Sequence, residues 1–260
     1  MSTVQYEVQG RTAIVTIDRP EVRNAVDGAT AQALAHAFRT FDADPSLSVA
    51  ILTGAHGTFC AGADLKAILA GRGNRVALDG DGPMGPTRML LSKPVIAAVE
   101  GHAVAGGLEL ALWCDLRVAA RDAVFGVFCR RWGIPLIDGG TVRLPRLIGH
   151  SHALDMILTG RGVSGDEARA MGLANRLTEP GQALAGALDL ARQLDAYPQR
   201  NLRSDRLCSY RQWDLPLEEA IRHETAVGLD VLSQPGVFDE VREFVAGKGR
   251  HGEGVPRDGA

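Results

Sequence analysis

The sequence predicts an α/β fold in which strands and helices alternate first and helices alone follow. Short apolar runs bounded by glycine-rich loops recur up to about residue 126, and helical apolar spacing dominates after about residue 140. The chain has 260 residues, 45% of them hydrophobic, which is enough for one large core. We therefore expect a core over residues 1–195 and a C-terminal helical region with a polar tail over residues 196–260.

The predicted strands are short runs of apolar and β-branched residues between turn signals. The first two form a hairpin around Gly10. A single apolar strand then precedes each of two glycine-rich loops. The strands are expected at residues 4–8, 13–17, 49–53, 94–99, 116–120 and 124–126.

Helices are predicted where apolar residues recur three and four positions apart behind a capping residue. Asp27 is the expected N-cap of a helix ending near residue 42. Residues 71–87 are rich in Gly and Pro and are expected to form a mobile surface segment. The other helices are expected at residues 64–70, 107–114, 139–148, 151–158, 164–171, 180–195, 199–206, 215–233 and 236–246.

Charge and cysteine usage exclude several classes of protein. A formal net charge of −3 argues against a nucleic acid or an anionic membrane as partner. The N-terminal residues lack the pattern of a signal peptide, and no apolar run approaches the length of a membrane span. The four cysteines are far apart, as in reduced cytosolic proteins. We expect a cytoplasmic protein without a metal site.

Two familiar motifs are present in unsuitable surroundings. The G-x-G-x-x-G at residues 80–85 contains a proline and lies in the Gly/Pro-rich segment, so it is not expected to bind a dinucleotide. Ser151 stands in a near match to the nucleophile elbow of serine hydrolases. Because a helical run follows it, Ser151 is expected to be an N-cap rather than a nucleophile.

Two loops, at residues 57–66 and 101–110, are more informative. Each brings small residues to the C-terminal end of an apolar strand, where α/β folds bind ligands. The N–H groups that begin the second helix, near Gly106, could stabilise an oxyanion, and Glu109 lies within the first turn of that helix. The alternative is that the glycines serve packing and Glu109 complements the helix dipole. Spacing alone leaves both interpretations open.

These loops and other motifs resemble the crotonase superfamily, the enoyl-CoA hydratase/isomerase family, over nearly the whole chain. The resemblance implies a spiral of ββα units with a C-terminal helical trimerisation region, assembled as homotrimers or hexamers. It also implies an acyl-CoA substrate whose coenzyme A is part of that substrate, with no further cofactor. The motifs are residues 18–25 (DRPEVRNA), 59–65 (FCAGADL), 94–101 (PVIAAVEG), 105–115 (AGGLELALWCD) and 139–144 (GGTVRL).

The resemblance also implies roles for individual residues. The backbone N–H groups of Ala63 and Gly106 correspond to an oxyanion hole for the thioester oxygen, and Glu109 corresponds to a catalytic glutamate. Lys66 could meet the nucleotide phosphates, and a looser match gives Lys248 the same role. The residues implied to bind coenzyme A are Arg23, Ala25, Ala61, Asp64, Leu65 and Lys66.

The second acid of the family's hydratases is missing from its expected position. Cys129, four residues beyond the aligned Phe125, stands there, and a thiol is a poor proton donor. Asp138, nine residues later, resembles the catalytic aspartate of dienoyl-CoA isomerases and aryl-CoA dehalogenases. The alternative is that Asp138 caps the following helix. Arg130 or Arg131 could pair with Asp138 or Glu109, and Trp132 could line the acyl pocket.

Hydration of a 2-enoyl-CoA, with a thioester enolate held in the oxyanion hole, is the expected reaction, because hydration is the commonest activity of the family that the sequence resembles. An enoyl- or dienoyl-CoA isomerase using Glu109 and Asp138 is one alternative, because a single carboxylate can move a proton between C2 and C4. A CoA-thioester-binding protein with little catalysis is the other. Glu109 argues against it, since thioester binding alone has no use for a carboxylate there.

Overall fold

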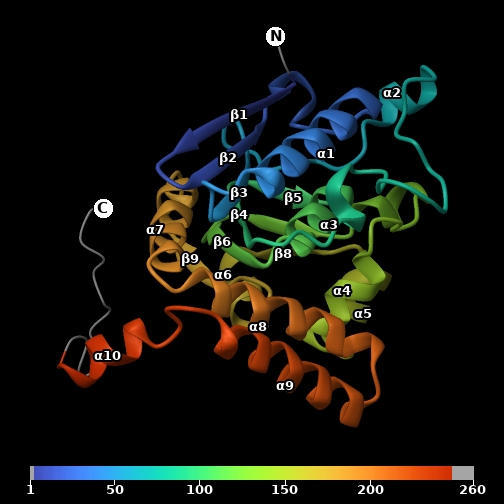
Figure 1. Cartoon of the computed structure of the whole chain (residues 1–260). Helices are drawn as coiled ribbons and strands as arrows, with labels where there is room; N and C mark the ends of the chain where they lie inside the picture. Colours follow the sequence, from blue (N-terminus) through green and yellow to red (C-terminus); the bar gives the residue numbers. More distant parts are fainter. Residues whose placement is uncertain (1–2, 248–260) are drawn as a thin grey trace. The chain divides into compact units, whose positions relative to one another are not determined.

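The computed structural model describes residues 3–247, so Lys248 and most of the polar tail lie outside the described residues. The chain divides into two compact units, Met1–Ala191 and Arg192–Ala260. Strands of the first unit form a six-stranded and a three-stranded sheet (Figure 1). The larger has the order β1 (Val4–Gln9), β2 (Thr12–Ile17), β3 (Val49–Gly54), β4 (Val95–Val99), β6 (Leu116–Ala120) and β9 (Arg176–Thr178). The smaller has the order β5 (His102–Val104), β7 (Val124–Gly126) and β8 (Gly162–Ser164).

The larger sheet is parallel except for the first hairpin. β1 pairs with β2 antiparallel, and β2, β3, β4, β6 and β9 follow in parallel register. Leu52 on β3 lies between Val15 and Ala97 of the neighbouring strands. Because both faces of such a sheet are covered, β3 and β4 consist of continuous apolar runs. The carboxyl ends of these parallel strands lead into the two glycine-rich loops.

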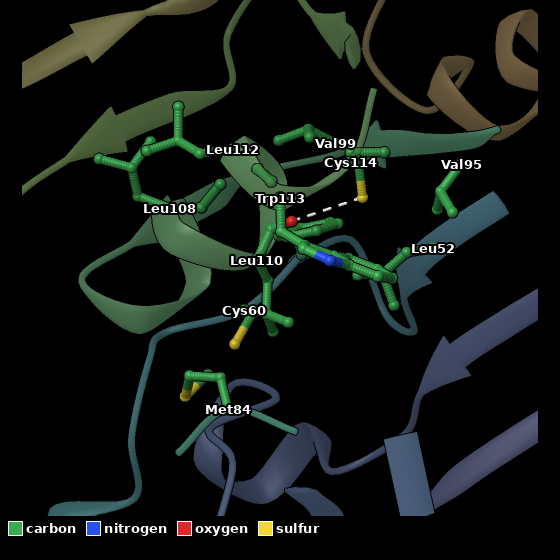
Figure 2. Packing of buried hydrophobic residues seen from close by; sticks show 14 of the residues in the cluster. Leu52, Cys60, Met84, Val95, Val99, Leu108, Leu110, Leu112, Trp113 and Cys114 are labelled. Atoms are coloured by element: carbon green, nitrogen blue, oxygen red, sulfur yellow. Dashed lines mark hydrogen bonds between the residues drawn. The ribbon is translucent and has the colours of Figure 1, made fainter. Parts of the chain in front are cut away.

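Helices of the first unit pack against this sheet or follow it. α1 packs on the hairpin, and the Asp27 carboxylate accepts a bond from the Thr30 backbone N–H at 2.9 Å, as expected of its N-cap. Phe38 on α1 meets Trp113 on α3 edge to face, 4.8 Å between ring centres. Trp113, Leu110 and Met84 belong to the buried cluster of Figure 2. The helices are α1 (Gly28–Ala43), α2 (Leu65–Leu69), α3 (Gly106–Trp113), α4 (Gly140–Ile148), α5 (His150–Thr159), α6 (Gly165–Ala170) and α7 (Ala183–Asp195), whose residues from Arg192 onward belong to the second unit.

The second unit is helical throughout its described part. It contains α8 (Gln199–Arg211), α9 (Leu217–Ser233) and α10 (Asp239–Val245). α8 and α9 pack against each other. The sequence predicted all three helices, whereas it missed β5, β8 and β9, each only three residues long.

Two expectations are wrong. Residues 82–87, expected in a mobile surface segment, are buried, because Met84 enters the core and Asp138 binds the backbone of Met84. Gly149 rather than Ser151 precedes α5, so Ser151 is an exposed residue inside that helix and not its cap.

Two absences hold for residues 3–247. No helix among them is long and apolar enough to cross a membrane. No group of three or more His, Cys, Asp or Glu side chains in this range could hold a metal ion. All four cysteines, which fall within it, are free thiols.

Candidate active site

The two glycine-rich loops lie edge to edge beyond the ends of β3 and β4. Cys60 forms an isolated parallel bridge with Ala103, in which its N–H donates to the His102 carbonyl at 2.8 Å and its carbonyl accepts from the Val104 N–H at 3.1 Å. A Cβ on Gly107 would lie 2.1 Å from the Cys60 carbonyl oxygen. Only glycine therefore permits this approach of the second loop to the first.

The backbone N–H groups of Ala63 and Gly106, in these loops, have no hydrogen-bond acceptor among the described residues. Val26 bonds to the carbonyl of Gly62 and the N–H of Asp64, which leaves the N–H of Ala63 without a partner in the described chain. Gly106 is the first residue of α3, so its N–H has no intrahelical acceptor. Both residues line the same cavity.

Ala105 sets the direction in which α3 begins. Its φ is positive (φ 53°, ψ −124°), which is rare for a residue with a side chain. Its N–H donates to the Gly126 carbonyl at 2.9 Å, and its carbonyl accepts from the Glu109 N–H at 3.2 Å. These bonds hold a strained conformation of the kind that clusters at functional sites.

One cavity of about 790 Å³ brings together the expected acid/base, oxyanion, acyl-pocket and coenzyme A residues, except Lys248, which lies outside the described residues. This volume lies in the range of small-molecule and cofactor sites. The lining includes Arg23, Ala25, Ala61, Ala63, Asp64, Leu65, Lys66, Gly106, Glu109, Cys129, Trp132 and Asp138.

Glu109 is almost completely buried, with 2% of its surface exposed. Its Oε1 accepts bonds of 2.8 Å from the backbone N–H groups of Asp138 and Gly140, which links the first turn of α3 to the start of α4. Burial, reinforced by the nearby Asp138 carboxylate, raises the pKa of Glu109 to about 7. A carboxyl group with this pKa can both accept and donate a proton near neutral pH.

Asp138 does not cap α4, so that interpretation is wrong. The cap position belongs to Gly139, and no side chain fills it. The Asp138 carboxylate instead accepts bonds from the Met84 backbone N–H at 2.9 Å and from the Thr87 hydroxyl. Burial raises the pKa of Asp138 despite these bonds and the nearby charges of Arg88 and Arg143.

Cys129 and Trp132 lie on a 3₁₀ helix, Phe128–Trp132, at the cavity wall. Burial and the neighbouring Glu109 raise the pKa of the Cys129 thiol. The thiol is therefore protonated at neutral pH and is a weaker acid than a free cysteine. Trp132 lines the cavity while remaining 73% exposed.

The two arginines between them point elsewhere. Arg130 donates to the Ile157 carbonyl at 3.2 Å. Arg131 donates to the Gly160 carbonyl at 2.8 Å and stacks on the Phe128 ring at 3.8 Å. The expectation that one of them pairs with Glu109 or Asp138 is wrong, because both bond to backbone carbonyls instead and the arginines that act on Asp138 are Arg88 and Arg143.

Comparison with known proteins agrees with this geometry. The sequence model of the enoyl-CoA hydratase/isomerase family matches residues 7–237. The chain belongs to this family. It is 38% identical to the enoyl-CoA hydratase EchA19 of Mycobacterium tuberculosis, covering 92% of this chain and 91% of the relative. A carnitinyl-CoA dehydratase of Salmonella arizonae is 37% identical over 88% of this chain and 92% of its own.

Solved structures of the enoyl-CoA hydratase/isomerase family share the fold. The enoyl-CoA hydratase EchA1 of Mycobacterium marinum superposes with a TM-score of 0.89 at 37% identity, over 98% of both chains. A carnitinyl-CoA dehydratase of Mycobacterium avium does so with a TM-score of 0.76 at 33% identity, over 87% of this chain and 92% of that one. The chain is thus an enzyme of this family with the crotonase-like α/β fold of ββα units.

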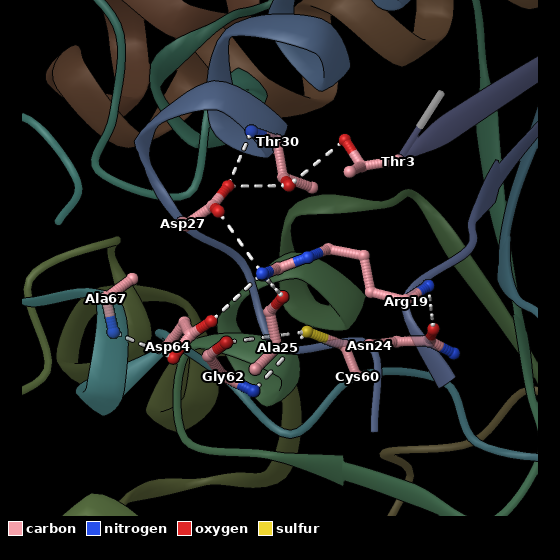
Figure 3. Close-up of polar contacts among 10 residues, drawn as sticks. All are labelled: Thr3, Arg19, Asn24, Ala25, Asp27, Thr30, Cys60, Gly62, Asp64 and Ala67. Carbon is pink, nitrogen blue, oxygen red and sulfur yellow. Dashed lines mark hydrogen bonds and ion pairs between the residues drawn. The ribbon is translucent and has the colours of Figure 1, made fainter. Parts of the chain in front are cut away.

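The sequence did not indicate the structural role of Arg19. Arg19 is buried between Asp27 and Asp64, 3.2 Å and 3.0 Å from their carboxylate oxygens (Figure 3). The Asp64 carboxylate also caps α2 by accepting a bond from Ala67 N–H at 3.0 Å. The side chain of Asp64 is thereby committed to the loop itself. An arginine next to a proline just after a buried strand was the only available signal.

Proposed function

We propose that this enzyme hydrates the double bond of a 2-enoyl-CoA thioester. The main support for this proposal is that Glu109, with a pKa of about 7, lies in one cavity with the backbone N–H groups of Ala63 and Gly106, which have no acceptor among the described residues. Two such donors suit a thioester oxygen that gains negative charge, and the carboxyl suits proton transfer next to it.

In the proposed reaction, the N–H groups of Ala63 and Gly106 bind the thioester oxygen. The Glu109 carboxylate accepts a proton from a water molecule while the oxygen of that water molecule bonds to C3. The C2–C3 electron pair moves toward the thioester and forms an enolate, which the two donors stabilise. Glu109 then returns the proton to C2. Addition of water is thereby completed by one carboxyl group and without a cofactor.

The same proposal assigns the open end of the cavity to coenzyme A. Lys66 and Leu65 are exposed at the start of α2, and Lys66 would meet the nucleotide phosphates as a cation. Arg23, Ala25 and Ala61 would line the path between them and the reacting carbons. The homotrimer or hexamer and the cytoplasmic location stay predictions.

Migration of the double bond between the C2–C3 and C3–C4 positions is the second candidate reaction. The observation that favours it is the Cys129 thiol, whose pKa is raised, at the position expected for a second acid. A single carboxyl such as Glu109 suffices for moving one proton between two carbons.

Parallel assays of crotonyl-CoA hydration and 3-enoyl-CoA isomerisation test both reactions. Glu109→Gln keeps the acceptor for the Asp138 and Gly140 N–H groups but cannot exchange protons, so the dominant activity should fall at least about 100-fold. Glu100→Gln is the matched control. Glu100 accepts backbone bonds from Gly181 and Ala183 and does not line the cavity, so its rates should stay within about threefold. Equal rates for wild type and Glu109→Gln would refute the mechanism.

A further inference from the structure

Pro83 and Met84, in the segment of residues 82–88, line the cavity, and hydrogen bonds attach this segment to Asp138 just before α4. Oδ1 of Asp138 accepts from both the Met84 N–H and the Thr87 hydroxyl. Arg143 joins the same two regions, donating to the Asp138 carbonyl at 2.8 Å and to the Thr87 carbonyl at 2.6 Å. The attachment therefore involves the side chain and the main chain of one residue.

The segment of residues 82–88 packs against Gly106, the proposed oxyanion donor. Met84 is 1% exposed, and a Cβ on Gly106 would lie 2.7 Å from its sulfur atom. Gly82 is equally constrained, since a Cβ there would lie 1.9 Å from the Thr87 hydroxyl oxygen. The segment thus has little freedom to shift while these bonds hold, and Met84 is the side chain that meets the first residue of α3.

Asp138 also meets the proposed acid/base group, but through its backbone. Its N–H donates to Oε1 of Glu109 at 2.8 Å, while its carboxylate is turned to Met84 and Thr87. One residue therefore connects Glu109 on one side with the segment that packs on Gly106 on the other.

We propose that Asp138 is a positioning residue, which fastens Met84 against Gly106 and orients Glu109 through its backbone N–H. It rests on the proposed function, because the donor and the acid/base group are those of the hydration mechanism. Asp138 then needs to accept hydrogen bonds but not to exchange a proton.

The charge of Asp138 adds a second, measurable effect. The groups that face Glu109 are the Asp138 carboxylate and the Cys129 thiol, and those that act on Asp138 are Arg88 and Arg143. Removing the negative charge of Asp138 lowers the pKa of Glu109, because a like charge nearby disfavours ionisation. The acidic limb of the rate profile should then move to lower pH.

Two substitutions at Asp138 separate acceptance from acidity. Asp138→Asn retains an acceptor oxygen for Met84 and Thr87, so kcat should stay within about fivefold while the acidic limb moves to lower pH. Asp138→Ala removes the acceptor, and kcat should fall about 100-fold with a smaller change in KM, as when an oxyanion donor is displaced. Amide exchange of residues 82–88 should accelerate in Asp138→Ala and not in Asp138→Asn.

Thr87→Val removes one hydrogen bond of the attachment while leaving residue 138 and the residues that line the cavity unchanged. It should accelerate the amide exchange of residues 82–88 and lower kcat, as Asp138→Ala does. Thr53→Val is the matched control, since Thr53 is a buried threonine whose hydroxyl donates to the Ala98 carbonyl within the sheet. Its kcat and the exchange of residues 82–88 should equal those of the wild type.

Two results would overturn the positioning role. One is an Asp138→Asn variant that loses as much kcat as Asp138→Ala while residues 82–88 exchange as in the wild type, which would make Asp138 a proton-transfer group. The other is wild-type exchange in Asp138→Ala. A wild type that neither hydrates nor isomerises would refute the proposed function alone, because the exchange comparison decides the attachment without any turnover.

Discussion

Asp27 and Asp138 are two buried aspartates with the same kind of partners and opposite titration. Oδ1 of Asp27 accepts from the N–H and hydroxyl of Thr30, at 2.9 Å and 2.7 Å. Oδ1 of Asp138 accepts likewise from the Met84 N–H and the Thr87 hydroxyl. Burial acts to raise the pKa of both aspartates. At Asp27 the hydrogen bonds and charges around the carboxylate outweigh this effect, so the pKa of Asp27 is lowered. At Asp138 burial prevails and the pKa is raised.

The two sites differ in how far hydrogen bonds and neighbouring charges offset burial. At Asp27 burial is opposed by the Thr30 bonds and by Arg19, which is in direct contact with both Asp27 and Asp64, so the pKa of Asp27 is lowered. At Asp138 burial outweighs the hydrogen bonds and the nearby arginine charges, and the Asp138 carboxylate in turn raises the pKa of Glu109. Buried carboxylates with counter-ions serve structure, whereas buried carboxylates facing one another in a cavity mark a candidate site of proton chemistry.

Removing the counter-ion should produce the largest effect on this contrast. Arg19→Met leaves Asp27 and Asp64 buried without their cation, so the free energy of unfolding at pH 7 should fall by about 3–5 kcal/mol in urea titrations. Because the pKa of Asp27 is lowered in the folded state, its contribution is present above pH 3.8 and is lost as the pH falls further. The loss caused by Arg19→Met should therefore shrink in acid.

Arg39→Met provides the control, because the ion pair of Arg39 with Asp81 is half exposed and should contribute at most about 1 kcal/mol. If Arg19→Met and Arg39→Met destabilise the protein equally, Arg19 is not what distinguishes the two regions.

Most of the fold could be predicted because its signals are local. The N-cap at Asp27, the apolar runs of β3 and β4 and the glycines of the two loops each depend on nearby residues. β8 and β9 could not be predicted, since three-residue strands are defined by the partner strands to which they bond. The burial of residues 82–87 also arises from distant partners.

The candidate site divides in the same way. Glu109 and the two N–H donors were found because they lie on loops with a distinctive sequence. The contact of Asp138 with Thr87 spans 51 residues, and that of Arg19 with Asp64 spans 45, so no spacing rule could reveal them. The sequence predicted which residues meet in the cavity, and the structure shows to which groups their side chains bond.

The second prediction concerns the stability of Glu109→Gln. The folded-state pKa of about 7 exceeds the ordinary value of 4.5, so the folded protein binds the proton more tightly between these pH values. The free energy of unfolding should therefore decrease as the pH rises from 4.5 through 7, by about 3 kcal/mol in total. Glu109→Gln lacks this decrease. Relative to the wild type, it should gain stability between pH 4 and pH 8 in parallel urea titrations.

This result would be opposite in sign to that of Arg19→Met, and it would accompany a loss of activity, as is typical where a site sacrifices stability for function. A stability difference between wild type and Glu109→Gln that does not vary with pH would show that Glu109 ionises like an exposed carboxyl.

The smallest effect should come from Cys129. Cys129→Glu places a second carboxyl group beside Glu109, at the position where the family's hydratases have one. If a second acid limits hydration, the rate of crotonyl-CoA hydration should rise about tenfold, which is modest for general acid catalysis because the surroundings are not adapted to it. The added charge should also raise the pKa of Glu109 and move the acidic limb to higher pH.

Cys129→Gln has the same length without the acid and controls for crowding at this buried position. Equal rates for Cys129→Glu and Cys129→Gln would mean that the native cavity already has the proton donors it needs. Proton exchange by Asp138 would then regain support, and the contrast between Asp27 and Asp138 would be one of catalysis against structure. A gain specific to Cys129→Glu would leave Glu109 as the one proton-transferring carboxyl and Asp138 as its support.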